Sequence, residues 1–79
     1  MLSPRLIKIA AQVFDVPEAS LMPETGVGDL DAWDSLGHLR LMMEVEHEFN
    51  VRFSTEQIRK LISLAEIQNA LLTAGSVDE

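Results

Sequence analysis

The sequence predicts an all-α domain with three main helices, one short helix and a long loop after the first helix. Apolar residues recur at spacings of three and four, and two capping boxes open helices in the C-terminal half. The strand-like stretch 51–53 has no second strand to pair with. A chain of 79 residues is expected to be one domain, 1–79, since domains usually run to about 100–200 residues. Nearly every apolar side chain is then needed for the core, which leaves little room for a deep catalytic cavity.

The first helix is expected to open at Ser3 and Pro4 and to stop before Pro17. Ser3 can accept a hydrogen bond from the first turn, and Pro4 at the first helical position loses nothing by lacking an N–H. The residue before a proline is pushed out of the helical region. The apolar face of this helix comprises Leu6, Ile9 or Ala10, Val13 and Phe14.

A long loop is expected over residues 15–33. Its turn-forming residues are Pro17, Pro23, Gly26 and Gly28. Connections of this length are uncommon in compact domains and are often functional. Three spaced apolar residues are expected to hold the loop against the core: Leu21, Val27 and Leu30.

The strongest helix is expected over residues 34–50, with Asp31 or Asp34 as its cap and Asn50 at its end. Its buried stripe is expected to comprise Leu39, Met42, Val45, Glu46 and Phe49, with Glu46 at the edge. A neighbouring face carries Leu36, Arg40, Met43 and His47.

Two shorter helices follow, each opened by a capping box. Ser54 with Gln57 begins the first, and Ser63 with Glu66 begins the second, which Gly75 ends. The residues expected to face inward are Ile58, Leu61 and Ile62 in the first helix, and Ile67, Ala70 and Leu71 in the second.

The composition excludes several classes of function. Thirteen acidic residues against six Lys and Arg give a net charge of −7, which disfavours nucleic acid and anionic membranes and favours basic protein partners. No apolar run approaches the roughly 18 residues of a membrane helix, so no membrane insertion is expected. The apolar stretch 6–13 is interrupted by Lys8 and Gln12 and lacks a cleavage site, unlike a secretory signal. A cytoplasmic location is therefore expected.

Known metal and catalytic motifs are incomplete. The chain has no cysteine. His47-Glu48 lacks the second histidine of the zinc-protease motif, because Val51 stands there. Ser35 and His38 lie one helical turn apart, but a hydrolase also needs an oxyanion hole and a group that orients the imidazole. Neither a metal site nor independent catalysis is expected.

Ser35 lies in the first turn of the longest predicted helix, directly after the long loop. The unpaired N–H groups and the positive end of the helix dipole would stabilise an attached anion there by roughly 0.3–1 kcal/mol. The position of Ser35 is compatible with two interpretations. Ser35 can carry an anionic group, or it is an ordinary polar residue at a helix start.

The segment Asp34-Ser35-Leu36 resembles the phosphopantetheine attachment motif of acyl carrier proteins. The likeness runs from about Leu6 to Leu72. Further positions that match the family pattern are Leu21, Pro23, Thr25, Asp29, Leu30, Leu39, Leu41, Met43, Val45, Glu46, Glu48, Phe49, Phe53, Glu56, Ile58, Leu61 and Ile67. The resemblance implies a four-helix, acyl-carrier-like bundle.

The resemblance also implies a function. Ser35 would be the attachment residue for 4′-phosphopantetheine, which a phosphopantetheinyl transferase takes from coenzyme A, and Asp34 would assist that reaction. The thiol of the arm would carry acyl groups as thioesters, so that the chain itself performs no turnover. An imported thiol would account for a functional carrier without cysteine.

Five residues are expected to recognise partners: Leu36, Arg40, Met43, Glu44 and Glu48. The partners would be the transferase and the enzymes that activate or transfer acyl groups, acting on a monomer. Read without the family, Leu36 and Met43 are equally explained as core residues, and Glu44 and Glu48 as a solvated acidic face.

Trp33, Gly37, His38 and Arg40 depart from the carriers of general fatty-acid synthesis. We interpret them as an altered recognition face, which favours a specialised carrier in a dedicated fatty-acid, lipid or polyketide-type pathway. The alternative hypothesis is an unmodified acidic module that binds partners through Leu36 and Met43.

Overall fold

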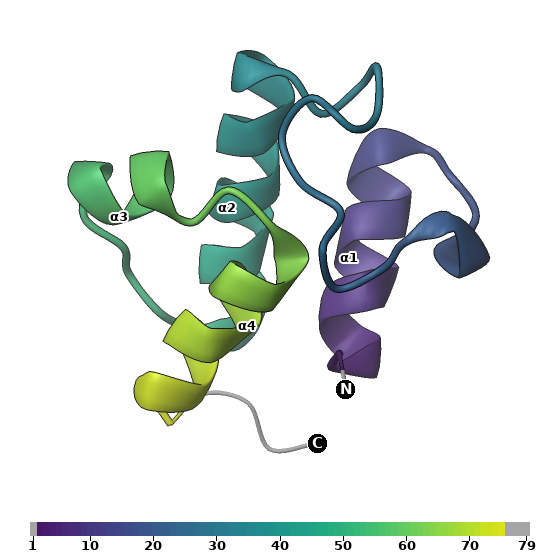
Figure 1. The fold of residues 1–79 in the computed structure, drawn as a ribbon. Coiled ribbons are helices and arrows are strands. Elements are labelled where there is room, and N and C mark those ends of the chain that lie inside the picture. Colours follow the sequence, from purple (N-terminus) through teal and green to yellow (C-terminus); the bar gives the residue numbers. More distant parts are fainter. Residues whose placement is uncertain (1, 76–79) are drawn as a thin grey trace.

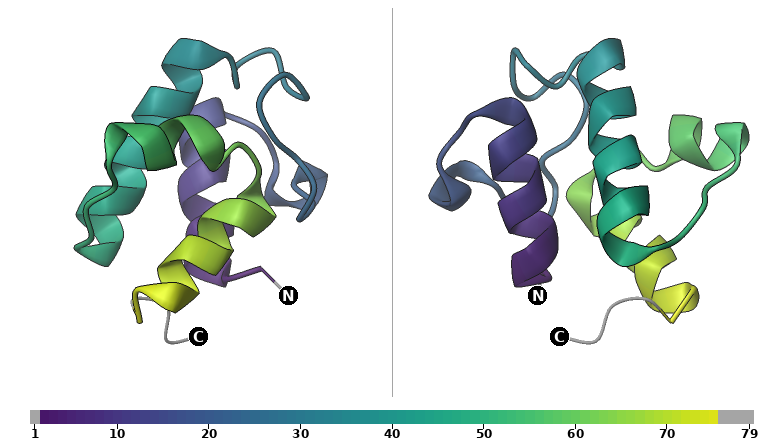
Figure 2. Two further views of the ribbon diagram at one scale, coloured as in Figure 1. Left: turned by 60° about the vertical axis from the view of Figure 1, so that its left-hand side comes forward. Right: turned by 180° about the vertical axis from the view of Figure 1, so that it is seen from behind.

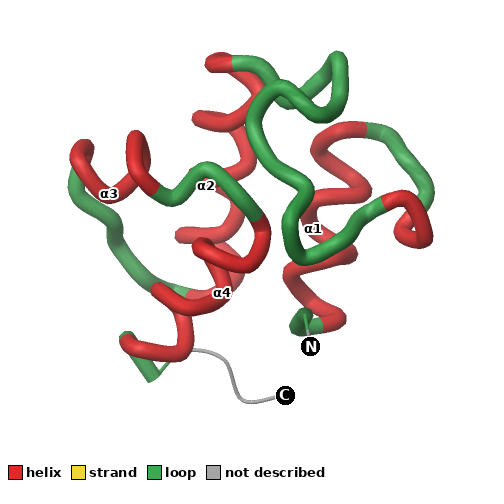
Figure 3. The backbone as a smooth tube through the Cα atoms, in the orientation of Figure 1, coloured by secondary structure: helices red, strands yellow, loops and turns green. Residues whose placement is uncertain are grey.

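The fold is given by a computed structural model, which describes residues 2–75. They form α1 (Pro4–Phe14), the 3-10 helix η1 (Glu18–Ser20), α2 (Ser35–Phe49), α3 (Thr55–Lys60) and α4 (Leu64–Thr73) (Figure 1). α1 and α3 lie on opposite sides of α2 (Figures 1 and 2). The described residues contain no strand, so the all-α prediction is confirmed, and the longest loop joins α1 to α2 (Figure 3). No helix within 2–75 combines the length and the apolar character that crossing a membrane requires.

α1 begins and ends through local backbone chemistry. The Ser3 hydroxyl accepts from the Leu6 N–H at 3.4 Å, and Pro4 occupies the first turn, as predicted. The helix ends at Phe14, three residues before Pro17, because Asp15 takes a left-handed conformation with φ of 55°. The residues that it buries are Leu6, Ile9, Ala10 and Phe14.

The buried face of α2 differs from the predicted one. Its buried residues are Gly37, His38, Leu41, Met42, Val45 and Phe49. Leu39, predicted to be buried, is 45% exposed, whereas Leu41 is fully buried. Consecutive helical residues point about 100° apart, so the choice between the two leucines depends on where the rest of the protein lies. Glu46 is half-buried, and its carboxylate accepts from the Phe53 N–H at 2.8 Å.

The capping box of α3 forms as predicted. The Gln57 N–H donates to the Ser54 hydroxyl at 3.1 Å, and the Ser54 N–H donates to the Gln57 side chain at 2.9 Å. Ile58 and Leu61 pack partly against the core, but Ile62 is 48% exposed, so its predicted burial is wrong. Ile62 lies past the end of α3, where the chain no longer follows the helical spacing.

The second capping box is only half formed. Ser63 caps α4 by accepting from the Glu66 N–H at 3.2 Å. The Glu66 carboxylate, however, accepts from the Ile62 N–H at 3.3 Å and the Ser63 hydroxyl at 3.1 Å instead of the Ser63 N–H. As predicted, α4 buries Ile67 and Leu71, and Gly75 follows it with φ of 72°.

The long loop is fixed to the junction between α3 and α4 by backbone hydrogen bonds. Val27 N–H donates to the Ile62 carbonyl at 2.9 Å, and Leu64 N–H donates to the Thr25 carbonyl at 3.0 Å. At Gly26 a Cβ would lie 2.2 Å from the Ile62 carbonyl oxygen, so only glycine fits. Because the backbone makes this contact, the Val27 side chain stays 40% exposed, and its predicted role in the core is wrong. Leu21 and Leu30 do pack on the core.

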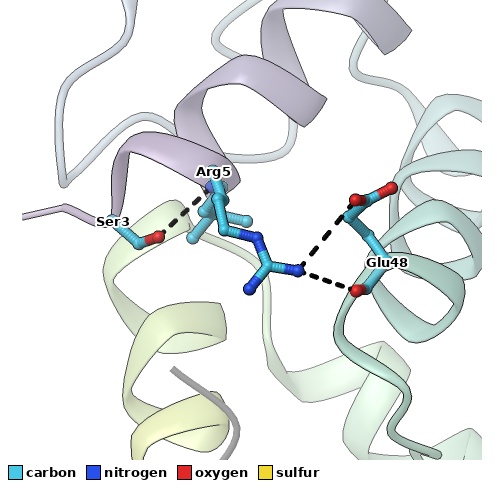
Figure 4. Close-up of polar contacts among 4 residues, drawn as sticks. Ser3, Arg5 and Glu48 are labelled. Atoms are coloured by element: carbon cyan, nitrogen blue, oxygen red, sulfur yellow. Dashed lines mark hydrogen bonds and ion pairs between the residues drawn. The ribbon is translucent and has the colours of Figure 1, made fainter. Parts of the chain in front are cut away.

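Arg5 joins the start of α1 to the end of α2 (Figure 4). Its guanidinium donates to the Glu48 backbone carbonyl at 2.9 Å and lies 4.4 Å from the centre of the Phe49 ring. The Ser3 N–H donates to the Gln68 side chain, which ties the same end of α1 to α4. These contacts fix the end of the bundle that lies away from the start of α2.

Candidate functional site

Ser35 is the first residue of α2, and its side chain is exposed. Asp34, in an extended conformation, caps the helix, and its Oδ1 accepts from the Gly37 N–H at 2.8 Å. Within residues 2–75 the N–H groups of Ser35 and Leu36 have no hydrogen-bond partner. An exposed hydroxyl thus lies beside two free N–H groups at the positive end of a helix, an arrangement that suits a phosphate.

The loop before Ser35 is folded by its own hydrogen bonds. The Gly28 N–H donates to the Trp33 carbonyl at 2.9 Å, and the Trp33 N–H donates to the Leu30 carbonyl at 3.0 Å. The Asp29 carboxylate accepts from the Gly26 N–H at 2.9 Å. The turn that presents Ser35 is therefore an ordered structure attached to the core.

Trp33 is central to this attachment. Its side chain is fully buried, and its ring stacks on Phe14 of α1 with centroids 4.8 Å apart. The indole Nε1–H donates to Nδ1 of His38 at 3.0 Å, and Nε2 of His38 lies 2.7 Å from the Ile58 carbonyl oxygen of α3. With both ring nitrogens engaged, His38 has none left to take a proton from Ser35.

These positions correct the predicted recognition face. Of the four residues interpreted as an altered recognition face, Trp33, Gly37 and His38 are buried, and only Arg40 is exposed. A sequence signal for Trp33 was present, since the largest side chain of a short chain is needed for its core. The hydrogen bond between His38 and Ile58 has no such signal, because it depends on α3, which follows 17 residues later in the chain.

Gly37 allows the loop to approach the first turn of α2. A Cβ at this position would lie 2.0 Å from the Ala32 carbonyl oxygen. Glycine is thus required here by a close backbone contact, although it is a poor helix former.

Gly37→Ala should therefore lower the free energy of unfolding. Alanine is favoured over glycine in helices by about 1 kcal/mol, but overpacking typically costs about 1–3 kcal/mol, and the blocking atom belongs to the backbone. Urea denaturation measures the change, with His47→Ala at an exposed position of the same helix as the control. A more stable Gly37→Ala variant would contradict the prediction.

The five predicted recognition residues are all exposed. Leu36 is 66% exposed and Met43 is 58% exposed, which excludes their interpretation as core residues. Four of the five lie along a groove of about 410 Å³ between α1 and α2. Its lining residues are Ile9, Gln12, Val13, Arg40, Met43, Glu44 and Glu48. The contribution of α1 was not predicted, because it arises only when the two helices pack together.

The groove differs in charge along its length. Arg40 lies on the side nearer to Ser35, and Glu44 and Glu48 follow one and two turns farther along α2. Arg40 forms no ion pair within residues 2–75. The groove therefore presents an unpaired cation on the side nearer to Ser35 and two carboxylates farther along α2, of which Glu48 lies 4.0 Å from the Arg5 guanidinium.

No protein-family model matches the chain. Within residues 2–75, no three His, Asp or Glu side chains gather closely enough to hold a metal ion.

Proposed function

We propose that this chain is an acyl carrier that bears 4′-phosphopantetheine on Ser35. The observation that carries the proposal is the exposed Ser35 hydroxyl at the first position of α2, beside the free N–H groups of Ser35 and Leu36. The motif Asp34-Ser35-Leu36 stands at this position. The four-helix, acyl-carrier-like arrangement belongs to the same proposal.

The residues around Ser35 suit the attachment of a phosphodiester. The Ser35 oxygen would form a bond to the phosphorus that carries the pantetheine of coenzyme A, and the bond to the other phosphate would break. Adenosine 3′,5′-bisphosphate would leave, and the transferase would accept the serine proton. Once bound, the arm supplies the thiol that forms a thioester, a group that the cysteine-free chain lacks.

Asp34 has two tasks in this proposal. One carboxylate oxygen caps α2 by accepting from the Gly37 N–H. The other has no hydrogen bond within residues 2–75, and the side chain is exposed, so it is open to the transferase. The cap keeps the helix start intact while the second oxygen takes part in recognition.

The exposed residues of α2 would recognise the transferase and the enzymes that load or use the acyl group. Leu36 and Met43 offer apolar contacts, Glu44 and Glu48 attract basic groups, and Arg40 requires a matching acid on the partner. Arg40 is the surface feature that supports a specialised carrier in a dedicated cytoplasmic pathway for fatty acids, lipids or polyketides. The protein would work as a monomer.

Partner binding should weaken as the salt concentration rises. Exposed charges are screened over about 10 Å at 0.1 M salt and about 3 Å at 1 M, so contacts to Glu44 and Glu48 lose most of their attraction. The Kd for the transferase, measured across this range, should increase with salt, and less steeply for Glu44→Gln combined with Glu48→Gln. Glu24→Gln, on the exposed loop, is the control. An affinity that is independent of salt would point to an apolar interface.

The proposal is tested by the intact mass of the protein after incubation with coenzyme A and a broad-specificity phosphopantetheinyl transferase. A gain of one phosphopantetheine supports the carrier. An unchanged mass favours the alternative, an unmodified interaction module, which the exposure of Leu36 and Met43 also fits.

A further inference from the structure

α3 is weakly attached to the rest of the molecule. It has six residues, none of them buried, and only Ile58 packs partly against the core. Within residues 2–75, one hydrogen bond joins α3 to another helix, namely that between His38 Nε2 and the Ile58 carbonyl. The attachment of α3 thus depends strongly on one side chain of α2.

The same side chain orients the loop before Ser35. An indole N–H can only donate, so His38 Nδ1 must accept from Trp33, and the ring proton must then lie on Nε2. From Nε2 this proton is donated to the Ile58 carbonyl. A single tautomer of His38 therefore satisfies both bonds, and each bond favours the tautomer that the other requires.

Trp33 and His38, which share one of these hydrogen bonds, flank the candidate attachment residue in the sequence. Trp33 lies two residues before Ser35, and His38 lies three residues after it. The Ala32 carbonyl contacts Gly37 so closely that a side chain would not fit between them. A shift of the Trp33 ring would thus be transmitted directly to the backbone that carries Ser35.

We infer that His38 is a positioning residue that couples the attachment of α3 to the conformation of the Ser35 turn. When α3 is attached, the Ile58 carbonyl holds the His38 ring, and the ring holds Trp33 and the loop in place. When α3 detaches, the ring loses its orientation and the turn at Ser35 loosens. The coupling involves only residues of this chain, so it holds whether or not Ser35 carries an arm.

Two substitutions separate the two bonds of His38. His38→Asn keeps an acceptor near the position of Nδ1 for Trp33 but is too short to reach the Ile58 carbonyl. His38→Gln keeps a donor near the position of Nε2 for Ile58 but lacks the acceptor for Trp33. His47→Gln, the other histidine, lies exposed on the same helix and serves as the control.

Three measurements report on the two ends of the coupling. Hydrogen exchange of the Ile58 and Leu61 amides reports on α3, and the fluorescence of Trp33, the sole tryptophan, reports on the loop. The NMR shifts of the Ser35 and Leu36 amides report on the turn itself. Exchange of the amides in α1 shows in the same sample whether the fold as a whole is intact.

The coupling predicts that each variant affects both ends. Exchange in α3 should become about fivefold faster or more, as expected for the loss of a hydrogen bond, even in His38→Gln. The Trp33 emission should move to longer wavelength, and the Ser35 and Leu36 amide signals should shift, even in His38→Asn. The control His47→Gln should change none of these readouts. If each variant affects only the end whose bond it removes, or if α1 exchange rises equally, the inference is wrong.

Discussion

Ser35→Ala should abolish the gain of phosphopantetheine completely. Alanine has no oxygen to bond to phosphorus, and no other serine of residues 2–75 combines exposure with the first position of a long helix. The variant should fold normally, because Asp34 still caps α2 and alanine is the best helix former. Intact mass after treatment with the transferase and coenzyme A measures the effect, and circular dichroism checks the fold.

Ser20→Ala is the matched control for this experiment. Ser20 is also exposed, but it lies in the short helix η1, and its hydroxyl donates to the Pro17 carbonyl at 2.7 Å. Its replacement should leave the mass gain unchanged. A mass gain in Ser35→Ala, or its loss in Ser20→Ala, would place the attachment elsewhere and contradict the role proposed for Ser35.

Trp33→Ala should cause the largest loss of stability among the substitutions considered. Truncating a buried tryptophan costs about 3–5 kcal/mol, and here the change also removes the stack on Phe14 and leaves His38 Nδ1 without its donor. Small domains are stable by only about 5–15 kcal/mol, so a large part of the folding free energy would be lost. Urea denaturation followed by circular dichroism measures the change.

Trp33→Phe and Leu72→Ala are the comparisons for this effect, and both should lose less stability than Trp33→Ala. Phenylalanine keeps an aromatic ring against Phe14 but removes the N–H, so the loss should be clearly smaller than for alanine. Leu72 is 51% exposed, and its truncation should change stability by no more than about 0.5 kcal/mol. A loss below about 1 kcal/mol in Trp33→Ala would contradict the central place of Trp33 in the core.

Because Trp33, Gly37 and His38 are buried, their role is structural and they do not contact partners directly. They shape the loop and the first turn of α2 from beneath, and none of them offers a surface to a partner. Substitutions at these positions are therefore expected to act through the stability and order of the Ser35 turn. In the proposed function, the choice of partner would depend on the exposed residues of α2, which include Arg40.

The local features of the helices could be read from the sequence. Ser3, Asp34, Ser54 and Ser63 each cap the helix that follows, because a cap forms between residues three positions apart. The exposure of Ser35 follows in the same way from its place directly after a cap. Each of these contacts lies within four consecutive residues, so the local sequence is enough to predict it.

Only the tertiary structure decided which sides of the helices face inward and what meets at the start of α2. Leu41 is buried in place of Leu39, and the groove beside Arg40 exists because α1 packs against α2. His38 joins Trp33 to a carbonyl 20 residues farther along the chain. Such contacts depend on the relative positions of distant segments, which the spacing of residues within one helix does not specify.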